Sequence, residues 1–213
     1  MNRRQIDGYL AILAAQLDRP ARAYVTGAAA GALWGRVRPS VDIDLGLELR
    51  SGNDRSWVTV QSAVDRTTRL TGIPASVAED IDRWGMITLL DYRRSSRLYR
   101  RFGQLEVRLL NPVIWAIGKL TRYLDPDIRD VMEVFRKLSV PWRNAARTWG
   151  TALRASPAST SQFQFRKNVE NFFSGRGRTV WGKSFDPVAA VAGFHRAAHI
   201  VEETASSRQA RRK

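Results

Sequence analysis

The sequence predicts an α/β (α+β) fold, with a mixed sheet flanked by helices and a basic helical appendage at the C-terminal end. Three patterns support this class. Residues 6–17 place isoleucine and leucine at the spacing of one helical face. Residues 41–49 instead alternate between apolar and polar side chains, which is typical of a strand with one buried face. Residues 160–173 and 187–204 are amphipathic with helical spacing, which predicts helices in the last third of the chain.

The remaining elements follow in chain order. We expect a strand over 23–26, a helix over 28–34 that Gly35 ends, and a helix over 57–71. Strands are expected over 86–90 and 105–110, joined by an arginine-rich connection. Asn111-Pro112 and Asp125-Pro126 each combine a capping side chain with a first-turn proline, which predicts helices to about residues 122 and 138.

Composition limits the class of protein. Apolar residues are 44% of the 213, so the chain can bury a core and is not a disordered tail. It has no cysteine, which excludes disulfides, thiolate zinc sites and a cysteine nucleophile. No apolar stretch approaches the 18 to 20 residues or so of a membrane helix, and the first residues are polar, so we expect a cytoplasmic protein without membrane contact.

The charge is high and uneven. Lys and Arg number 35 against 20 Asp and Glu, a formal net charge of +15. Residues 1–140 carry +6 and residues 141–213 carry +9, so we place a boundary at Pro141 between an α/β core and a basic helical region. This charge favours nucleic acid as the partner.

Two short motifs in the first part carry the chemistry. Gly27 lies where a strand is expected to turn into a helix, and a glycine there lets backbone N–H groups approach a phosphate. Asp42 and Asp44 are two apart on the next expected strand, so both carboxylates point to one side. Paired carboxylates repel unless a cation lies between them, which predicts a Mg²⁺ site.

These motifs resemble the nucleotidyltransferase superfamily, the polymerase-beta-like fold. The strand, the Gly27-Ala28 turn, the helix and the strand with Asp42-Ile43-Asp44 follow in the family's order. The chain is also similar to the AbiEii-like branch, the toxins of type IV toxin–antitoxin systems, in two downstream segments: residues 111–122, which end in Lys119-Leu120-Thr121-Arg122, and Asp127-Ile128-Arg129-Asp130. The resemblance covers roughly residues 20–138.

The resemblance implies roles for particular residues. Asp42 and Asp44 would hold Mg²⁺; Thr26, Gly27, Ala28, Lys119 and Arg122 would bind the NTP; and Asp130 would help to build the pocket. The third metal carboxylate is Glu106 or Asp91, with Glu106 favoured because it alternates correctly on its own strand. Ala28 departs from the family, whose second turn residue is often a serine that contacts phosphate.

The implied activity is Mg²⁺-dependent transfer of NMP from an NTP to an RNA hydroxyl, with a tRNA 3′ end as the acceptor suggested by the family. By the same resemblance the chain is a toxin with a separately encoded antitoxin. Two alternatives stand beside it. One is an antitoxin that transfers AMP to a partner toxin, and the other is a catalytically silent RNA-binding module that keeps the fold.

Two further groups of residues are candidate sites. The arginines between Arg93 and Arg101, with Tyr92 and Tyr99 among them, suit phosphate contact and base stacking as well as a solvated surface. His195 and His199 are four apart like half of a zinc-protease motif, but Arg196 occupies the place of the required Glu.

Overall fold

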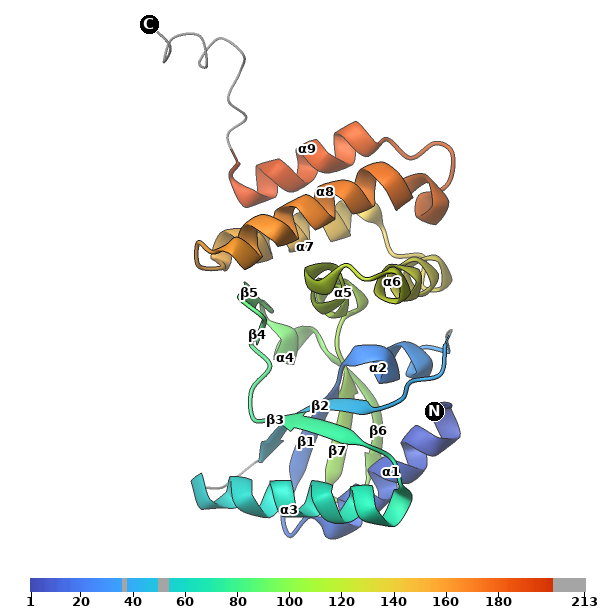
Figure 1. Cartoon of the computed structure of the whole chain (residues 1–213), viewed down its shortest axis with the longest axis vertical. Helices are drawn as coiled ribbons and strands as arrows, with labels where there is room; N and C mark the ends of the chain where they lie inside the picture. Colours follow the sequence, from blue (N-terminus) through green and yellow to red (C-terminus); the bar gives the residue numbers. More distant parts are fainter. Residues whose placement is uncertain (36–37, 50–53, 201–213) are drawn as a thin grey trace, which may run out of the picture.

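The computed structural model describes residues 1–35, 38–49 and 54–200 (Figure 1). Within these ranges a five-stranded sheet has the order β3-β2-β1-β7-β6, so the predicted α/β class is confirmed. Its strands are β1 (Ala21–Val25), β2 (Ile43–Leu49), β3 (Ala75–Ala78), β6 (Arg97–Phe102) and β7 (Leu105–Leu109). β1 runs parallel to β7 and antiparallel to β2, β2 runs parallel to β3, and β6 runs antiparallel to β7. A separate hairpin consists of β4 (Arg83–Trp84) and β5 (Ile87–Thr88).

The two faces of the sheet differ, as the alternation of β2 predicts. Apolar residues such as Ala23, Leu47 and Val107 are fully or almost fully buried on the face that packs against the first long helices. These helices are α1 (Arg3–Gln16) and α3 (Asp54–Thr71), which lie together below the sheet in Figure 1. Arg22, with Glu48 and Glu106 beside it in register, occupies the other face.

A helical layer covers the end of the sheet at which β1 and β7 terminate (Figure 1). Its members are α5 (Pro112–Arg122), α6 (Asp125–Lys137), α7 (Trp142–Ala155), α8 (Thr160–Trp181) and α9 (Pro187–Ala198). The short helices α2 (Gly27–Leu33) and α4 (Tyr92–Ser95) lie between this layer and the sheet. Among the helices of the described ranges, none combines the length and apolar character that crossing a bilayer requires.

The boundary expected at Pro141 falls inside this helical layer, between α6 and α7. The indole Nε1 of Trp149 on α7 donates to the backbone oxygen of Val113 on α5 at 2.9 Å. Asn168 on α8 likewise donates to the backbone oxygen of Leu120 on α5 at 2.8 Å. The helices on both sides of the junction therefore share buried contacts.

Several elements differ from the expectations. α7, β3 and β6 were not expected, and β5 covers only two residues of the strand expected over 86–90. α8 continues eight residues past Phe173, whereas α9 ends at Ala198 because His199 has a left-handed backbone conformation. The remainder of the helix expected to residue 204, from residue 201 on, lies outside the described residues.

Candidate functional site

The ends of β1 and β7 bring two helices together. The strands are parallel and in register, so Val25 and Leu109 lie side by side at the end of the sheet. α2 follows β1 and α5 follows β7. The indole Nε1 of Trp115 on α5 donates to the backbone oxygen of Gly27 at 2.8 Å, which fixes α5 against the turn that begins α2.

Asp44 reaches the same place from β2. The backbone N–H of Thr26 donates to the backbone oxygen of Asp44 at 2.9 Å, which extends the β1–β2 pairing by one residue. Gly27 has φ +59°, and a Cβ built on it would lie 2.1 Å from Oδ2 of Asp44. A glycine is therefore needed here both for the backbone conformation and for room beside the carboxylate. The structure thus brings together the turn and the acidic motif that the sequence singled out.

The carboxylates of Asp42 and Asp44 have unusual surroundings. Asp42 lies immediately before β2, where its backbone oxygen accepts a hydrogen bond from Ser40 Oγ at 2.6 Å. Both side chains are partly buried, and no group within the described ranges donates a hydrogen bond to either carboxylate. Burial, together with the nearby charge of Asp42, raises the pKa of Asp44, while Arg122 and Lys119 act in the opposite direction.

This pair of carboxylates fits a divalent cation. Two carboxylates that are partly removed from water and lack hydrogen-bond donors are stabilised by a hard cation that prefers oxygen ligands, such as Mg²⁺. The described residues contain no group of three or more acids or histidines that could share a metal. The site therefore supplies two carboxylates rather than the three that the resemblance implies.

Lys119 occupies a different position from the one expected for a phosphate contact. Its side chain is only 2% exposed, and its Nζ lies 2.8 Å from both Asp127 Oδ1 and Asp130 Oδ2. It also lies over the ring of Trp115, at 5.7 Å from the centroid. Lys119 thus forms ion pairs with two buried carboxylates beneath the protein surface. From there its positive charge lowers the pKa of Asp44 and so partly offsets the effect of burial. Asp127 belongs to the downstream segment that resembles the family, but the resemblance implied no role for it.

Two arginines bring positive charge to the surface at this place. Arg122 NH2 lies 2.8 Å from Asp127 Oδ1, and its side chain is 47% exposed. Arg38 forms two short contacts with Asp130, at 3.0 and 3.1 Å, and is 41% exposed. Each arginine shares its carboxylate with Lys119, so the two acids orient three cations. Arg38 was missed because it precedes the acidic motif in a loop with no helical or strand periodicity.

A narrow apolar recess lies between these groups. Gly27 and Thr26 line one side, and Gly118, Lys119 and Arg122 of α5 line another. The ring of Trp84 from the β4–β5 hairpin packs on Gly118, where a Cβ would come within 2.9 Å of it. The recess has room for about one water molecule, which is too little for a nucleobase in this conformation. No motif or periodicity in the sequence indicated that Trp84 lies at the candidate site.

Glu106 does not join the acidic pair, which corrects the favoured assignment of the third metal ligand. It shares a sheet face with Asp44 but pairs in register with Arg22, about 13 Å along the strands from the turn. Its carboxylate accepts hydrogen bonds from Arg22, Arg101 and Arg108 at 3.0 to 3.1 Å. Burial opposes ionisation, but the three guanidinium groups prevail and lower the pKa of Glu106 to about 2.

Asp91, the alternative third ligand, also lies apart from the pair. It is the N-cap residue of α4, with a left-handed φ of 48°. It lines a second groove together with Asn111 and Arg147 and does not line the recess beside Gly27. No third acid therefore takes its place beside Asp42 and Asp44 within the described ranges.

The two histidines do not form a metal site. His195 Nε2 lies 2.7 Å from Glu170 Oε1, whereas His199 Nε2 lies 2.6 Å from an Arg154 nitrogen. Because His199 follows the last residue of α9 with a left-handed backbone, the helical spacing of the pair is lost.

The arginine-rich connection is partly neutralised. Arg93 pairs with Glu48 and Asp80, and Arg100 pairs with Asp7. Tyr99, expected as a stacking residue, donates a hydrogen bond to Asp7 at 2.7 Å. With Arg101, which pairs with Glu106, three of the five arginines of this connection therefore belong to ion pairs.

Comparisons with protein-family models, with curated proteins and with solved structures each found no match to this chain. The resemblance to nucleotidyltransferases therefore depends on the motifs and on the geometry of the residues that carry them.

Proposed function

We propose that the protein is a Mg²⁺-dependent nucleotidyltransferase that transfers NMP from an NTP to a hydroxyl group of RNA. The observation that carries the proposal is the placement of Asp44. Its partly buried carboxylate lies against Gly27, beside Asp42, with no hydrogen-bond donor among the described residues. A purely structural acid would be expected to have a donor, as Glu106 does.

Cations and anions have separate roles in this proposal. Asp42 and Asp44 would hold Mg²⁺, which when bound polarises phosphate oxygens and neutralises their charge. The exposed ends of Arg122 and Arg38 bind and orient the phosphate chain. Lys119 acts as a positioning residue through Asp127 and Asp130. The hydroxyl oxygen forms a bond to the α-phosphorus, the bond to pyrophosphate breaks, and the hydroxyl proton leaves to solvent.

The acceptor is inferred from charge. A net charge of +15 favours a polyanion, and a tRNA 3′ end is the acceptor that the family resemblance suggests. By the same resemblance, the protein acts as a toxin in the cytoplasm and is neutralised by a separately encoded antitoxin.

One structural observation favours the silent RNA-binding module as a second candidate. Among the residues that the structure describes, no third acid joins Asp42 and Asp44, and Ala28 offers no hydroxyl group to a phosphate. Such a module would bind RNA without Mg²⁺ and would bind no NTP.

The test is incubation of the full chain with α-³²P-labelled NTPs, Mg²⁺ and total RNA. The wild type is expected to label RNA, and D42N/D44N is expected to lose the label. D18N/D65N, which removes two charges from exposed acids on other elements, is the matched control and should retain it. R122Q and R38Q are expected to raise the KM for NTP while the protein stays folded.

Three outcomes separate the candidates. Label that resists RNase but not protease would select transfer of AMP to a protein. RNA binding without label and without an NTP-induced thermal shift would select the silent module. Equal labelling by D42N/D44N and wild type would falsify the proposed site.

A further inference from the structure

Helix α7 carries a stripe of unpaired positive charge. Arg143, Arg147 and Arg154 lie within about 40° of one another around the helix axis, and all three are exposed. The helix contains no acidic residue. None of the three arginines has a carboxylate partner within the described ranges, in contrast to Arg93 and Arg101.

The contacts of these arginines leave their charge in place. Arg143 lies over the ring of Trp142, with its guanidinium carbon 4.4 Å from the centroid. Arg147 donates to the side-chain oxygen of Asn144 at 2.9 Å. Since neither partner is an anion, the stripe remains a positive surface about 16 Å long, which matches several phosphates of a strand.

A groove beside the stripe leads toward the candidate site. Asn144, Thr148 and Thr151 of α7 line one wall, and Ser95, Asn111 and the acid Asp91 line the other. The groove and the recess beside Gly27 share Ile114. Leu89 and Leu110 line the recess, and the residues that follow them in sequence, Leu90 and Asn111, line the groove.

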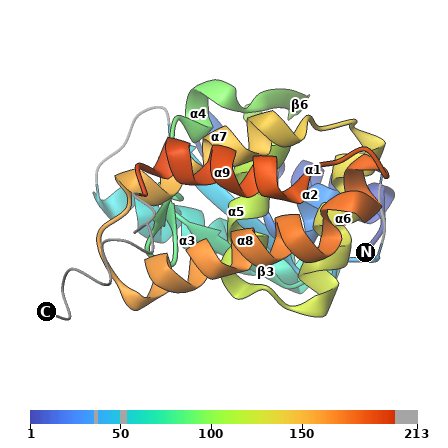
Figure 2. The same cartoon turned by 90° about the horizontal axis from the view of Figure 1, so that it is seen from above.

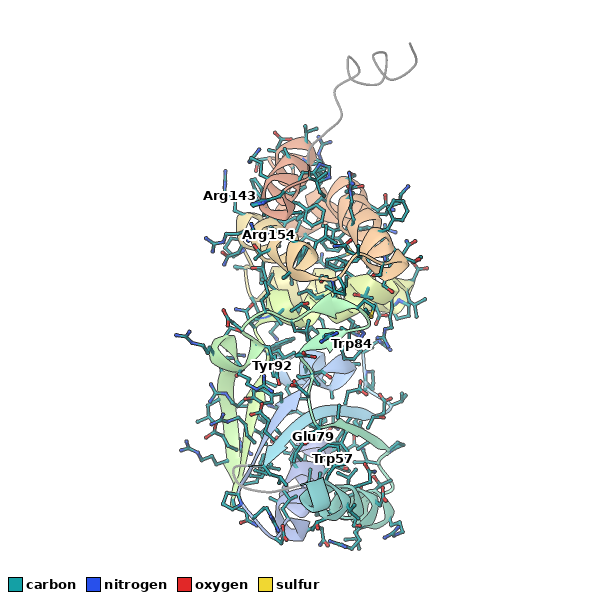
Figure 3. All side chains as sticks on the ribbon, turned by 90° about the vertical axis from the view of Figure 1, so that its left-hand side faces the viewer. Trp57, Glu79, Trp84, Tyr92, Arg143 and Arg154 are labelled. Carbon is teal, nitrogen blue, oxygen red and sulfur yellow. The ribbon has the colours of Figure 1, made fainter. Side chains whose placement is uncertain are left out.

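The figures place the stripe and the groove on one side of the molecule. Seen from above, α4, β6 and α7 lie along the same edge, and α8 lies on the other side of α9 (Figure 2). Figure 3 labels Arg143 and Arg154 above the strands on this side. Arg94, next to the groove-lining Ser95 in α4, and Arg97, at the start of β6, are exposed and have no ion pair among the described residues.

We infer that a single-stranded nucleic acid binds along this surface, with its phosphodiester backbone on the α7 arginines and in the adjoining groove. The polar groove wall supplies hydroxyl and amide groups that can contact sugars and phosphates. Contact with α7 follows from charge and shape alone. That the bound strand presents its end to Asp44 rests on the proposed nucleotidyltransferase function.

The test measures binding separately from catalysis. Fluorescence anisotropy with a labelled 12-nucleotide single-stranded RNA, and with its DNA equivalent, is recorded without NTP at several salt concentrations. R143Q/R147Q/R154Q is compared with K167Q/R176Q/R178Q, which removes three exposed charges from α8 on the other side of α9. A second variant, T151E, places one carboxylate on the groove wall, between Arg147 and Arg154 along the helix, and leaves the arginines intact.

We expect the α7 variant to raise Kd about tenfold or more and to lower the slope of log Kd against log salt by about 2 to 3. The α8 variant should change Kd less than about threefold, and T151E should weaken binding even if the triple variant does not fold. Equal weakening by the α7 and α8 variants, or an unchanged Kd for both α7 variants, would overturn the inference. The RNA and DNA arms show which strand is preferred. If binding depends on α7 but no NMP transfer is found, the inference that nucleic acid binds along α7 is supported and the proposed nucleotidyltransferase activity is contradicted.

Discussion

The position of Asp44 in the fold disfavours the charged form of its carboxylate. Its carboxylate is partly buried beside Asp42, and its pKa is raised mainly by burial. For an acid with a raised pKa, the stability contribution is present at low pH and is lost as pH rises through the folded pKa. At neutral pH Asp44 therefore destabilises the metal-free protein.

From this we expect D44N to be more stable than wild type without metal, with a higher Tm at neutral pH. Thermal unfolding with and without Mg²⁺ measures it. Mg²⁺ should raise the Tm of the wild type and leave that of D44N unchanged, and the wild-type gain should shrink as pH falls toward the pKa of Asp44. A D44N variant that is less stable than wild type would contradict a metal role for this carboxylate.

Glu106 shows the opposite behaviour, because three arginines hold its pKa at about 2. An acid with a lowered pKa stabilises the fold above its unfolded pKa, and this stabilisation is lost as pH falls through the folded value. The relevant window runs from the ordinary value of 4.5 down to about 2.

We predict that E106Q is less stable than wild type at pH 6, by about 1–3 kcal/mol, because it leaves the guanidinium groups of Arg22, Arg101 and Arg108 without their anion. Between pH 4.5 and 2 the stability of the wild type should fall more steeply than that of E106Q. Urea unfolding at pH 2.5, 3.5, 4.5 and 6 checks this. Parallel pH profiles would show that Glu106 is not the titrating group.

At the scale of single residues, the sequence predicted the parts of the site that neighbouring strands define. Gly27 and Asp44 come from consecutive strands, so their meeting follows from local pattern. Glu106 has the right alternation and does share the face of Asp44, but alternation specifies a face and not a position along the strand. The ion pairs of Lys119 depend on how α5 packs against α6, which no local pattern specifies.

At the scale of elements, the sequence predicted segments with clear periodicity and missed the others. Strand β6 has exposed or partly exposed residues throughout and lies at the edge of the sheet, so it lacks the apolar alternation of β2. Helix α7 buries small residues, including Ala145 and Gly150, where hydrophobic spacing is hard to recognise. Gly150 allows close approach of α9, since a Cβ there would lie 2.6 Å from the backbone oxygen of Phe194.

Helix α8 contains a natural matched pair for testing its packing. Gly175 and Gly177 are two residues apart in the same helix. A Cβ on Gly175 would meet nothing within 4 Å, whereas a Cβ on Gly177 would lie 2.0 Å from the ring of Phe185. The same chemical change should therefore have opposite signs at the two positions.

We expect G175A to stabilise the protein by about 1 kcal/mol, through helix propensity alone. G177A should destabilise it by about 1–3 kcal/mol, because the ring of Phe185 must move from its buried place among Trp181 and Phe173. Denaturant unfolding measures the free energy of unfolding of both variants and of the wild type. Stabilisation by both would mean that Phe185 does not pack on α8 in solution.

At the scale of the whole molecule, charge is distributed differently from what composition suggests. The sheet and its connections carry many arginines, but several are paired with acids, such as Arg22 with Glu106. The α7 arginines have no such partner among the described residues. Within the described residues, α7 therefore presents more unpaired positive charge than the arginine-rich connection does, although that connection holds more arginines.

The same scale decides whether Pro141 separates two domains. Trp149, which is fully buried, stacks on Phe135 of α6 with ring centroids 5.8 Å apart, and Trp181 donates to the backbone oxygen of Val140 at 2.7 Å. These contacts cross the junction, and the buried residues on both sides form one cluster. We therefore predict that the full chain unfolds in a single transition by calorimetry, with a calorimetric enthalpy equal to the van't Hoff enthalpy.

The same contacts predict that a fragment ending at residue 140 does not fold stably. It lacks the helices that cover Phe135 and the apolar face of α5. Exposure of large apolar side chains favours aggregation and loosens the packing of the helices that remain. The fragment is expected to bind a hydrophobic dye and to melt without a cooperative transition, while the full chain does neither. A fragment with a sharp transition of its own, together with two calorimetric transitions in the full chain, would establish the boundary at Pro141 as a true domain boundary.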